Sequence, residues 1–263
     1  MHFSDASDIT IVITSCGRFD LLKQTLNSLD ALNTTPIHSV IIAEDSSDEH
    51  VRGVIPTHWQ SKTQVLVNNP KLGQLASIDL AYSRVTTPYI FHCEDDWEFY
   101  RPGFIEASRC ILEEMPNVLQ VWLRSYTHDV RVSYPFHSLG ERFIIQGHAC
   151  SRLLSSNGAW QGFSFNPGLR RKRDYLLFAP FARFATSAEG ESELSKGYAQ
   201  EGFFAVVLES DAVRHIGGDA HVWGPADAKR RRQKQARKRR RIMAALGLLG
   251  LGMLLGLLCA RFL

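Results

Sequence analysis

The chain has 263 residues, 44% of them hydrophobic and 10% aromatic, which is enough to bury one large core with at most a small extension. Its formal charge of +3 is unevenly distributed, because ten of the thirteen residues at 229–241 are Lys or Arg. With Arg261 also set aside, 19 basic side chains face all 27 acidic ones in residues 1–228, a formal charge of −8 that argues against a nucleic-acid partner.

Strands and helices alternate along the first 126 residues. Runs of apolar, β-branched residues predict buried strands at 9–18, 38–48, 64–70, 88–97 and 117–126. Apolar residues at helical spacing predict helices at 19–32, 73–85 and 102–115. This alternation predicts an α/β fold with an open, mostly parallel sheet of the Rossmann-like kind and helices on both of its faces.

The alternation stops near residue 127. Residues 126–228 have the pattern of mixed strands and loops, with one helical stretch near 189–202. We therefore expect a mixed C-terminal extension of the same domain and not a second independent core.

Other sequence features exclude several classes of protein. Five cysteines without a CxxC spacing argue against a disulfide framework and a zinc site, and they favour a reducing compartment. The N-terminus lacks the charged and apolar regions of a secretory signal. No GxGxxG, GxxxxGK[ST], GxSxG or HExxH motif is present, which argues against a dinucleotide site, a P-loop, a hydrolase elbow and a zinc protease.

Polar side chains follow four of the predicted strands. They form the segments 14–18, 44–46, 68–69 and 94–96. Because ligands bind outside the carboxyl ends of the strands in open α/β sheets, we expect these segments to meet at one edge and form a site.

Three adjacent carboxylates, Glu94, Asp95 and Asp96, end the fourth strand. Like charges repel, and burying them without a partner is costly, so the group needs a counter-charge. A hard divalent cation such as Mg²⁺ or Mn²⁺ takes carboxylate oxygens together with substrate phosphates and water. We expect Asp96 to be the direct ligand, assisted by Glu94 or Asp95. A solvated acidic loop or a cap for the following helix is the structural alternative.

Three segments carry a resemblance to a known family. The stretches ITIVITSCGRFDLLKQTLNSL, VIIAEDSSD and NNPKLGQLASIDLAYSRVTTPYIFHCEDDWEF occur in this order within residues 1–125. Together they resemble the nucleotide-sugar half of family 2 glycosyltransferases with the GT-A fold, although the family's DxD motif begins here with Glu94. The resemblance implies a GT-A catalytic domain over 1–228, with a nucleotide-sugar half at 1–125 and an acceptor half at 126–228.

The resemblance also implies roles for individual residues. Thr14, Ser15 and Arg18 would lie against the ribose and phosphates of the donor. Asp45, with Glu44 beside it, would meet the nucleobase. The remaining donor-site residues implied are Lys71 and Gly73 near the diphosphate, Asp95 at the ribose, and Asp96 with Glu94 at the metal.

An inverting transferase needs a general base, and the candidates lie in AEGESELSKGYAQEGF. The four acidic residues there are Glu189, Glu191, Glu193 and Glu201. The resemblance favours Glu191 first and Glu193 second. Acidic residues at a helix start also favour the helix dipole, so a solvated structural role is the alternative.

One histidine and two tryptophans complete the candidate site. His215 resembles the late histidine of many GT-A enzymes, and a neutral imidazole can ligate Mn²⁺. Trp160 and Trp97 each offer a flat apolar face on which a sugar could stack. The alternatives are a structural loop histidine and two tryptophans packed in the core.

The C-terminal segment predicts a membrane anchor. Residues 242–260 carry no charge, and as a helix they would span roughly 28 Å, close to the ~30 Å hydrocarbon core of a bilayer. The basic linker at 229–241 would remain at the cytoplasmic face and bind anionic lipid. An interfacial helix, or a basic tail with an apolar end, is the alternative.

Together these features predict a metal-dependent glycosyltransferase that moves a sugar from a nucleoside-diphosphate donor, with inversion, to a glycan or lipid-linked acceptor at a membrane. Two other functions fit parts of the pattern. A nucleotidyltransferase would share the sheet and acidic cluster but usually has a Gly-rich loop after the first strand. A catalytically inactive GT-A-like module could serve as a membrane-tethered binding protein.

Overall fold

The computed structural model describes residues 1–218. The predicted basic linker at 229–241 and the predicted anchor at 242–260 lie outside the described residues. Within residues 1–218, no helix is long and apolar enough to cross a bilayer.

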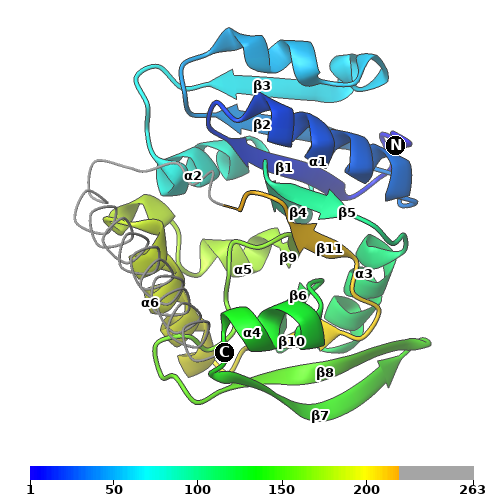
Figure 1. Cartoon of the computed structure of the whole chain (residues 1–263), viewed down its shortest axis with the longest axis vertical. Helices are drawn as coiled ribbons and strands as arrows, with labels where there is room; N and C mark the ends of the chain where they lie inside the picture. The colour runs from blue at the N-terminus through cyan, green and yellow to red at the C-terminus, as the bar shows by residue number, and fades with distance from the viewer. Residues whose placement is uncertain (219–263) are drawn as a thin grey trace, which may run out of the picture. The chain divides into compact units, whose positions relative to one another are not determined.

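The first sheet of the described chain has five strands (Figure 1). Its strand order is β3-β2-β1-β4-β9. The strands are β1 (Ile9–Ser15), β2 (Ser39–Glu44), β3 (Thr63–Val67), β4 (Tyr89–Glu94) and β9 (Gly168–Arg171). The first four are parallel, as predicted, and β9 runs antiparallel to β4 at the edge of the sheet.

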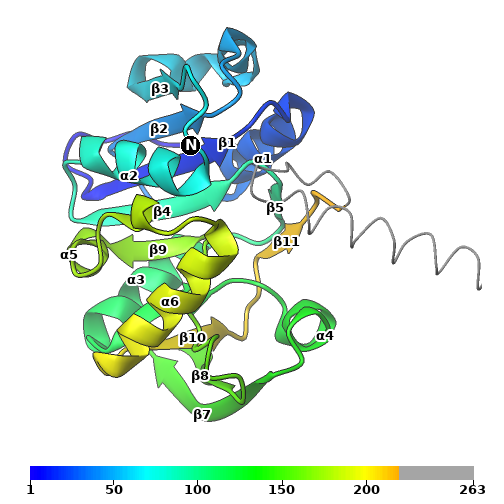
Figure 2. The ribbon, with the colours of Figure 1, turned by 90° about the vertical axis from the view of Figure 1, so that its left-hand side faces the viewer.

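Alternating side chains of the central strands bury both faces of this sheet. Ile9, Ile11 and Ile13 of β1 join a core with α1 (Phe19–Leu32) and α3 (Phe104–Glu114). Val12 and Ile41 point to the opposite face. That face is covered by α2 (Gln74–Arg84) and α6 (Ser187–Gln200), which lie toward the viewer in Figure 2. The apolar runs of the sequence are therefore continuous because both faces of the sheet are covered.

A second sheet has the order β6-β10-β8-β7. It consists of β6 (Val118–Trp122), β10 (Phe204–Leu208), β8 (His148–Ser155) and β7 (His137–Ile145). The strand predicted at 117–126 thus forms as β6 but pairs with β10, and the prediction that it joins the first sheet was wrong. The reason is that β9 occupies the edge beside β4. Gly168 permits β9 to lie close to β6, since a Cβ there would come 3.2 Å from the carbonyl oxygen of Val121.

A short ladder joins β5 (Trp97–Phe99) to β11 (Val213–His215) and places His215 opposite Trp97. The other helices are short. They are 3₁₀ turns at Glu49–Val54, Thr57–Lys62 and Phe181–Arg183, a π-helical turn at Tyr126–Val130, α4 (Arg131–Ser133) and α5 (Lys172–Leu176).

Candidate functional site

The carboxyl ends of β1, β2 and β4 lie side by side, because these strands are parallel and in register. Ser15 pairs with Glu44, and Thr14 pairs with Glu94. The structure therefore brings the predicted strand-end residues together at one edge of the sheet, where open α/β folds bind their ligands.

Arg18 supplies the counter-charge of the acidic segment. Its Nη1 lies 2.8 Å from Asp96 Oδ2, and its Nε donates to Asp95 Oδ2 at 3.2 Å, with a second bond from Nη2 to Asp95 Oδ1. The backbone N–H of Cys16 also donates to Asp95, at 3.3 Å. Burial nevertheless raises the pKa of Asp95 to about 6, although Arg18 favours its ionised form. The loop after β1 is thus tied to the acidic segment by charge.

Asp96 and His215 lie together at one corner of this edge. His215 Nε2 lies 3.0 Å from Asp96 Oδ2, although 119 residues separate them. Burial opposes ionisation of Asp96, but the hydrogen bond to His215 and the charge of Arg18 hold its pKa below the usual value. Gly217 lies against both side chains, since a Cβ there would come 2.4 Å from Asp96 Oδ2 and 2.9 Å from His215 Nε2.

This corner fits a divalent cation with two protein ligands. A carboxylate oxygen and an imidazole nitrogen suit Mn²⁺, and the missing side chain of Gly217 keeps the space beside them open. Within residues 1–218 no group of three or more His, Cys, Asp and Glu side chains could hold a metal. An ion here would therefore need further ligands from a substrate and water, as is common for Mg²⁺ sites that bind phosphates.

Glu94 lies beside this corner, but its oxygens are engaged. Gln74 Nε2 donates to Oε1 at 2.6 Å, and Trp97 Nε1 donates to Oε2 at 3.3 Å. Of the three predicted metal ligands, Asp96 and His215 contact each other, whereas Glu94 is held by Gln74 and Trp97. Burial, together with the nearby carboxylates of Asp96 and Glu191, raises the pKa of Glu94 to about 8.

Replacing Glu94 with Gln is expected to stabilise the metal-free protein at alkaline pH. Folding raises the Glu94 pKa from 4.5 to about 8, so its contribution to stability is present below pH 4.5 and is lost as pH rises to 8. The advantage of Glu94→Gln over wild type should therefore grow across that window, to about 1–2 kcal/mol after allowance for partial solvent screening. Urea unfolding at pH 5, 7 and 9 in the presence of a chelator measures it.

The matched control for this prediction is Glu98→Gln on the neighbouring strand β5, where the carboxylate pairs with Arg214 at 2.6 Å near the surface. Its stability relative to wild type should change little between pH 5 and 9. An advantage of Glu94→Gln that does not vary with pH would show that Glu94 is ionised in the folded protein.

The two acidic residues at the end of β2 have different environments. Asp45 uses both oxygens to hold the turn before α2, accepting from the backbone of Leu72 at 2.7 Å and of Gly73 at 2.8 Å. Glu44 accepts from Gly17 and Ser46 through Oε1 only, at 2.9 and 2.8 Å. Its Oε2 is buried without a hydrogen-bond partner among the described residues, so Glu44 retains an unused acceptor that Asp45 lacks.

The remaining predicted donor-site residues lie around this edge. Ser15 Oγ is also buried and makes no hydrogen bond within the described part of the chain. Thr14 is buried at the end of β1, and Lys71 Nζ donates to Cys16 Sγ at 3.2 Å. Ser46 Oγ is a third such atom, so this strand edge gathers three buried polar atoms that have no hydrogen-bond partner among the described residues.

Glu191 approaches the same edge from α6. Its Oε1 accepts from Ser164 Oγ at 3.0 Å and from the backbone of Phe165 at 2.9 Å, and burial raises its pKa. The start of α6 is also linked to α2, because Ser187 Oγ donates to Gln74 Oε1 at 2.5 Å. Glu193 is exposed and pairs with Lys196 at 2.7 Å. Of the two predicted bases, Glu191 is therefore the one near the acidic segment.

The two tryptophans differ in exposure. Trp97 is 2% exposed and belongs to the main core, so the structure shows the packing role that was its alternative. Trp160 is half-buried in the loop after β8.

Sequence reasoning missed Arg124, whose guanidinium lies 5.3 Å from the centre of the Trp97 ring and pairs with Asp129 at 2.6 Å. Arg124 lies just after the end of β6. The expectation that polar residues at the ends of strands form the site therefore applies to Arg124 as well.

A groove of about 480 Å³ lies elsewhere, at the opposite end of β4. Its lining includes Tyr89, Leu112 and Lys172. Because Tyr89 begins the strand that Glu94 ends, this groove is not part of the carboxylate edge.

Comparisons with known proteins identify the fold. No family model and no curated protein matches the chain. Solved structures do match: S. aureus TarS 1–349 (TM-score 0.57, 13% identity, 80% of this chain and 60% of that one) and the mannosyltransferase PcManGT from Pyrobaculum calidifontis in complex with GDP-Man and Mn²⁺ (0.55, 11%, 79% and 58%). GalNAc-T7 with UDP, GalNAc and Mn²⁺ matches with a TM-score of 0.58 and 10% identity, over 79% of this chain and 43% of that one.

This chain therefore spans about 60% or less of the length of these three structures. At sequence identities of 10–13%, these matches show which fold the chain has and do not show which substrate it binds. The parallel sheet, the acidic segment at the end of β4 and these matches together show that the chain has a GT-A-like glycosyltransferase fold.

Proposed function

We propose that this protein is a metal-dependent glycosyltransferase that transfers a sugar from a nucleoside-diphosphate donor. The observation that carries the proposal is the pairing of Asp96 with His215 at 3.0 Å, beside a strand edge where buried polar atoms have no partner among residues 1–218. Two of the matched structures contain Mn²⁺ together with a nucleotide or a nucleotide sugar, which supports the same function.

The donor would bind across the carboxyl ends of the strands. Asp96 and His215 would hold Mn²⁺ or Mg²⁺, which when bound neutralises the charge that develops on the diphosphate leaving group. Arg18 and Lys71 lie at the same edge and would bind phosphate oxygens. Glu44 and Ser15 have unused polar atoms with which to bind the nucleobase or ribose.

Glu191 would act as the general base. In the transfer step the acceptor hydroxyl gives its proton to the Glu191 carboxylate, and the acceptor oxygen bonds to the anomeric carbon. The bond from that carbon to the diphosphate breaks, and its electron pair leaves with the diphosphate. Attack from the face opposite the leaving group inverts the anomeric centre.

The acceptor would be a glycan or lipid-linked molecule at the cytoplasmic face of a membrane, with the chain anchored through residues 242–260. This part of the proposal depends only on the uncharged 19-residue segment and its basic flank. Deletion of 229–263 is expected to move the protein from the membrane to the soluble fraction on cell fractionation. Retention in the membrane fraction would contradict the anchor.

A panel of nucleoside diphosphates and nucleotide sugars, titrated calorimetrically with and without Mn²⁺, tests the proposed function. One nucleoside diphosphate should bind only when the metal is present. The protein should then release that nucleoside diphosphate from the corresponding nucleotide sugar. Binding without turnover would favour an inactive module. Release of pyrophosphate from a nucleoside triphosphate and a sugar phosphate would instead identify a nucleotidyltransferase.

A further inference from the structure

The loop at residues 164–166 lies between Glu191 and two buried polar side chains, Gln120 and Arg170. We propose that Gln120 and Arg170 form a clamp that fixes this loop and thereby positions the Glu191 carboxylate. Both are positioning residues, since they contact Glu191 only through the loop. The catalytic consequence rests on the proposed function, whereas the clamp itself does not.

Arg170 and Gln120 hold the loop backbone from two different sheets. Arg170 of β9 donates through Nη2 to the carbonyl oxygens of Ser164 at 2.6 Å and Asn166 at 3.3 Å. Gln120 of β6 accepts from the backbone N–H of Ser164 at 3.2 Å and donates to the Asn166 carbonyl at 3.5 Å. Four hydrogen bonds therefore fix a three-residue segment that has no regular secondary structure of its own.

The clamped loop presents two donors to one oxygen of Glu191. Ser164 Oγ and the backbone N–H of Phe165 both donate to Oε1, at 3.0 and 2.9 Å. Oε2 makes no hydrogen bond with any residue in the described part of the chain. The carboxylate is thus oriented through one oxygen, and the other remains available to accept a proton, which is the geometry a general base requires.

Arg170 has no carboxylate partner among the described residues. Within residues 1–218 no ion pair reaches it, and its guanidinium lies 5.3 Å from the ring centre of Phe163 and contacts the hydroxyl of Tyr82 at 3.5 Å. A buried cation without a paired anion is costly, so it is usually retained for another reason. Its charge favours ionisation of Glu191, which counteracts the effect of burial on the pKa of that residue.

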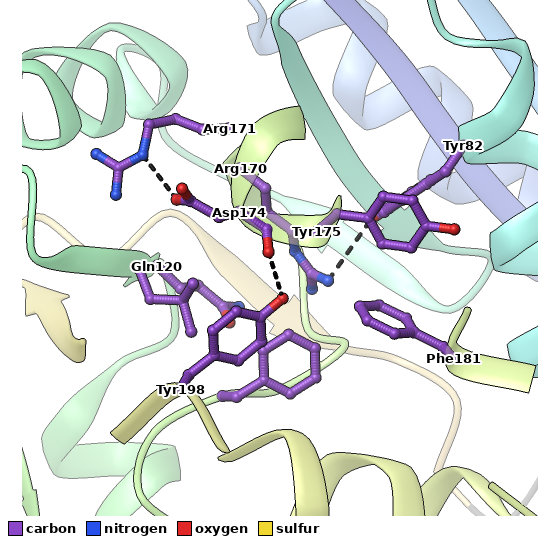
Figure 3. A pocket seen from close by; sticks show the side chains of 10 residues that line it. Tyr82, Gln120, Arg170, Arg171, Asp174, Tyr175, Phe181 and Tyr198 are labelled. Carbon is purple, nitrogen blue, oxygen red and sulfur yellow. Dashed lines mark hydrogen bonds and ion pairs between the residues drawn. The ribbon is translucent and has the colours of Figure 1, made fainter. Parts of the chain in front are cut away.

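Arg171 provides a contrast within the same strand. Figure 3 shows Arg171 directed toward Asp174, with which it pairs at 2.7 Å, while Arg170 points the other way toward Tyr82. Arg171 also donates to the carbonyl oxygens of Leu112 and Pro116. Both arginines are buried and both bind carbonyl groups, but only Arg170 contacts the loop that reaches Glu191.

The cavity drawn in Figure 3 excludes a ligand-binding role for the clamp. It is lined by Gln120 and Arg170 among others, and its volume is about 10 Å³, roughly the space that a single water molecule needs. No substrate fits there. The two side chains therefore bind the protein's own backbone.

Hydrogen exchange at the Phe165 amide tests the clamp without an activity assay. In the full chain, Arg170→Lys should speed exchange of this amide at least about tenfold beyond any global change in stability, because the lysine cannot bridge both carbonyls. Arg171→Lys is the matched control and should change the Phe165 amide only as far as it changes global stability. Gln120→Met is a second variant, with the same expected effect, should Arg170→Lys fail to fold.

Turnover then tests the consequence for catalysis, with water as acceptor and UDP- and GDP-sugars as donors. Arg170→Lys should lower kcat roughly 10–100-fold with KM for the donor changed less than about twofold, and it should have little further effect in a Glu191→Gln background. Equal effects of the Arg170 and Arg171 variants on Phe165 exchange would overturn the clamp. An intact clamp in a protein that turns over no donor would overturn the proposed function instead.

Discussion

Asp96→Ala is expected to weaken Mn²⁺-dependent binding of the nucleoside diphosphate by roughly 100-fold or more. Asp96 supplies the carboxylate that contacts His215, and without it His215 would be the one remaining protein ligand of this corner among residues 1–218. The change also removes one of the two carboxylates with which Arg18 pairs among residues 1–218, and Asp95 remains. Calorimetric titration of UDP and GDP at fixed Mn²⁺ measures the loss.

Glu98→Gln is the control for this binding experiment, and it is also the control for the pH-dependent unfolding of Glu94→Gln. Glu98 belongs to the same ladder as Trp97 and His215, yet it pairs with Arg214 and not with the corner. Its replacement should leave metal-dependent binding within about twofold of wild type. Metal-dependent binding that survives in Asp96→Ala would place the metal elsewhere and contradict the proposed donor site.

Glu191→Gln is expected to lower turnover by roughly 10²- to 10⁴-fold while donor binding changes little. The amide side chain preserves the acceptor for Ser164 and Phe165, so the loop should keep its conformation. What is lost is the ability to take a proton from the acceptor. Release of nucleoside diphosphate from a nucleotide sugar, measured as kcat and KM, separates the two effects.

Glu193→Gln serves as the matched comparison on the same helix. Glu193 is exposed and pairs with Lys196, so its removal should cost less than about twofold in kcat. If kcat fell strongly in Glu193→Gln and only slightly in Glu191→Gln, Glu193 and not Glu191 would be the general base.

The central sheet could be predicted because its strands are buried on both faces. Such strands appear in the sequence as continuous apolar runs, and the polar residues that end them lie at the ligand edge. The edge strand β9 could not be predicted in the same way. Its sequence GLRR contains two arginines, which are usually exposed, and they become buried only because distant carbonyl groups and Asp174 bind them.

In the candidate site, too, residues could be predicted from their position after a strand, whereas contacts between residues distant in the sequence could not. Residues that follow a strand, such as Arg18 and Asp96, were found from position alone. The contact between Glu94 and Gln74 was not predicted. Gln74 lies at the start of a helix twenty residues earlier, and no sequence motif links it to Glu94. The loop donors of Glu191 were also missed, since two strands of different sheets hold them in place.

The contact of Arg18 with the acidic segment has a consequence for biosynthesis. His215 follows Asp96 by 119 residues, so at roughly 5–20 residues per second it leaves the ribosome about 6–24 seconds later. During that interval the nascent chain already contains all three carboxylates but not the histidine. Arg18, made before any of them, can neutralise Asp95 and Asp96 as soon as β1 and β4 pair. It would thus act as an internal counter-ion that lets the N-terminal half fold before the corner is complete.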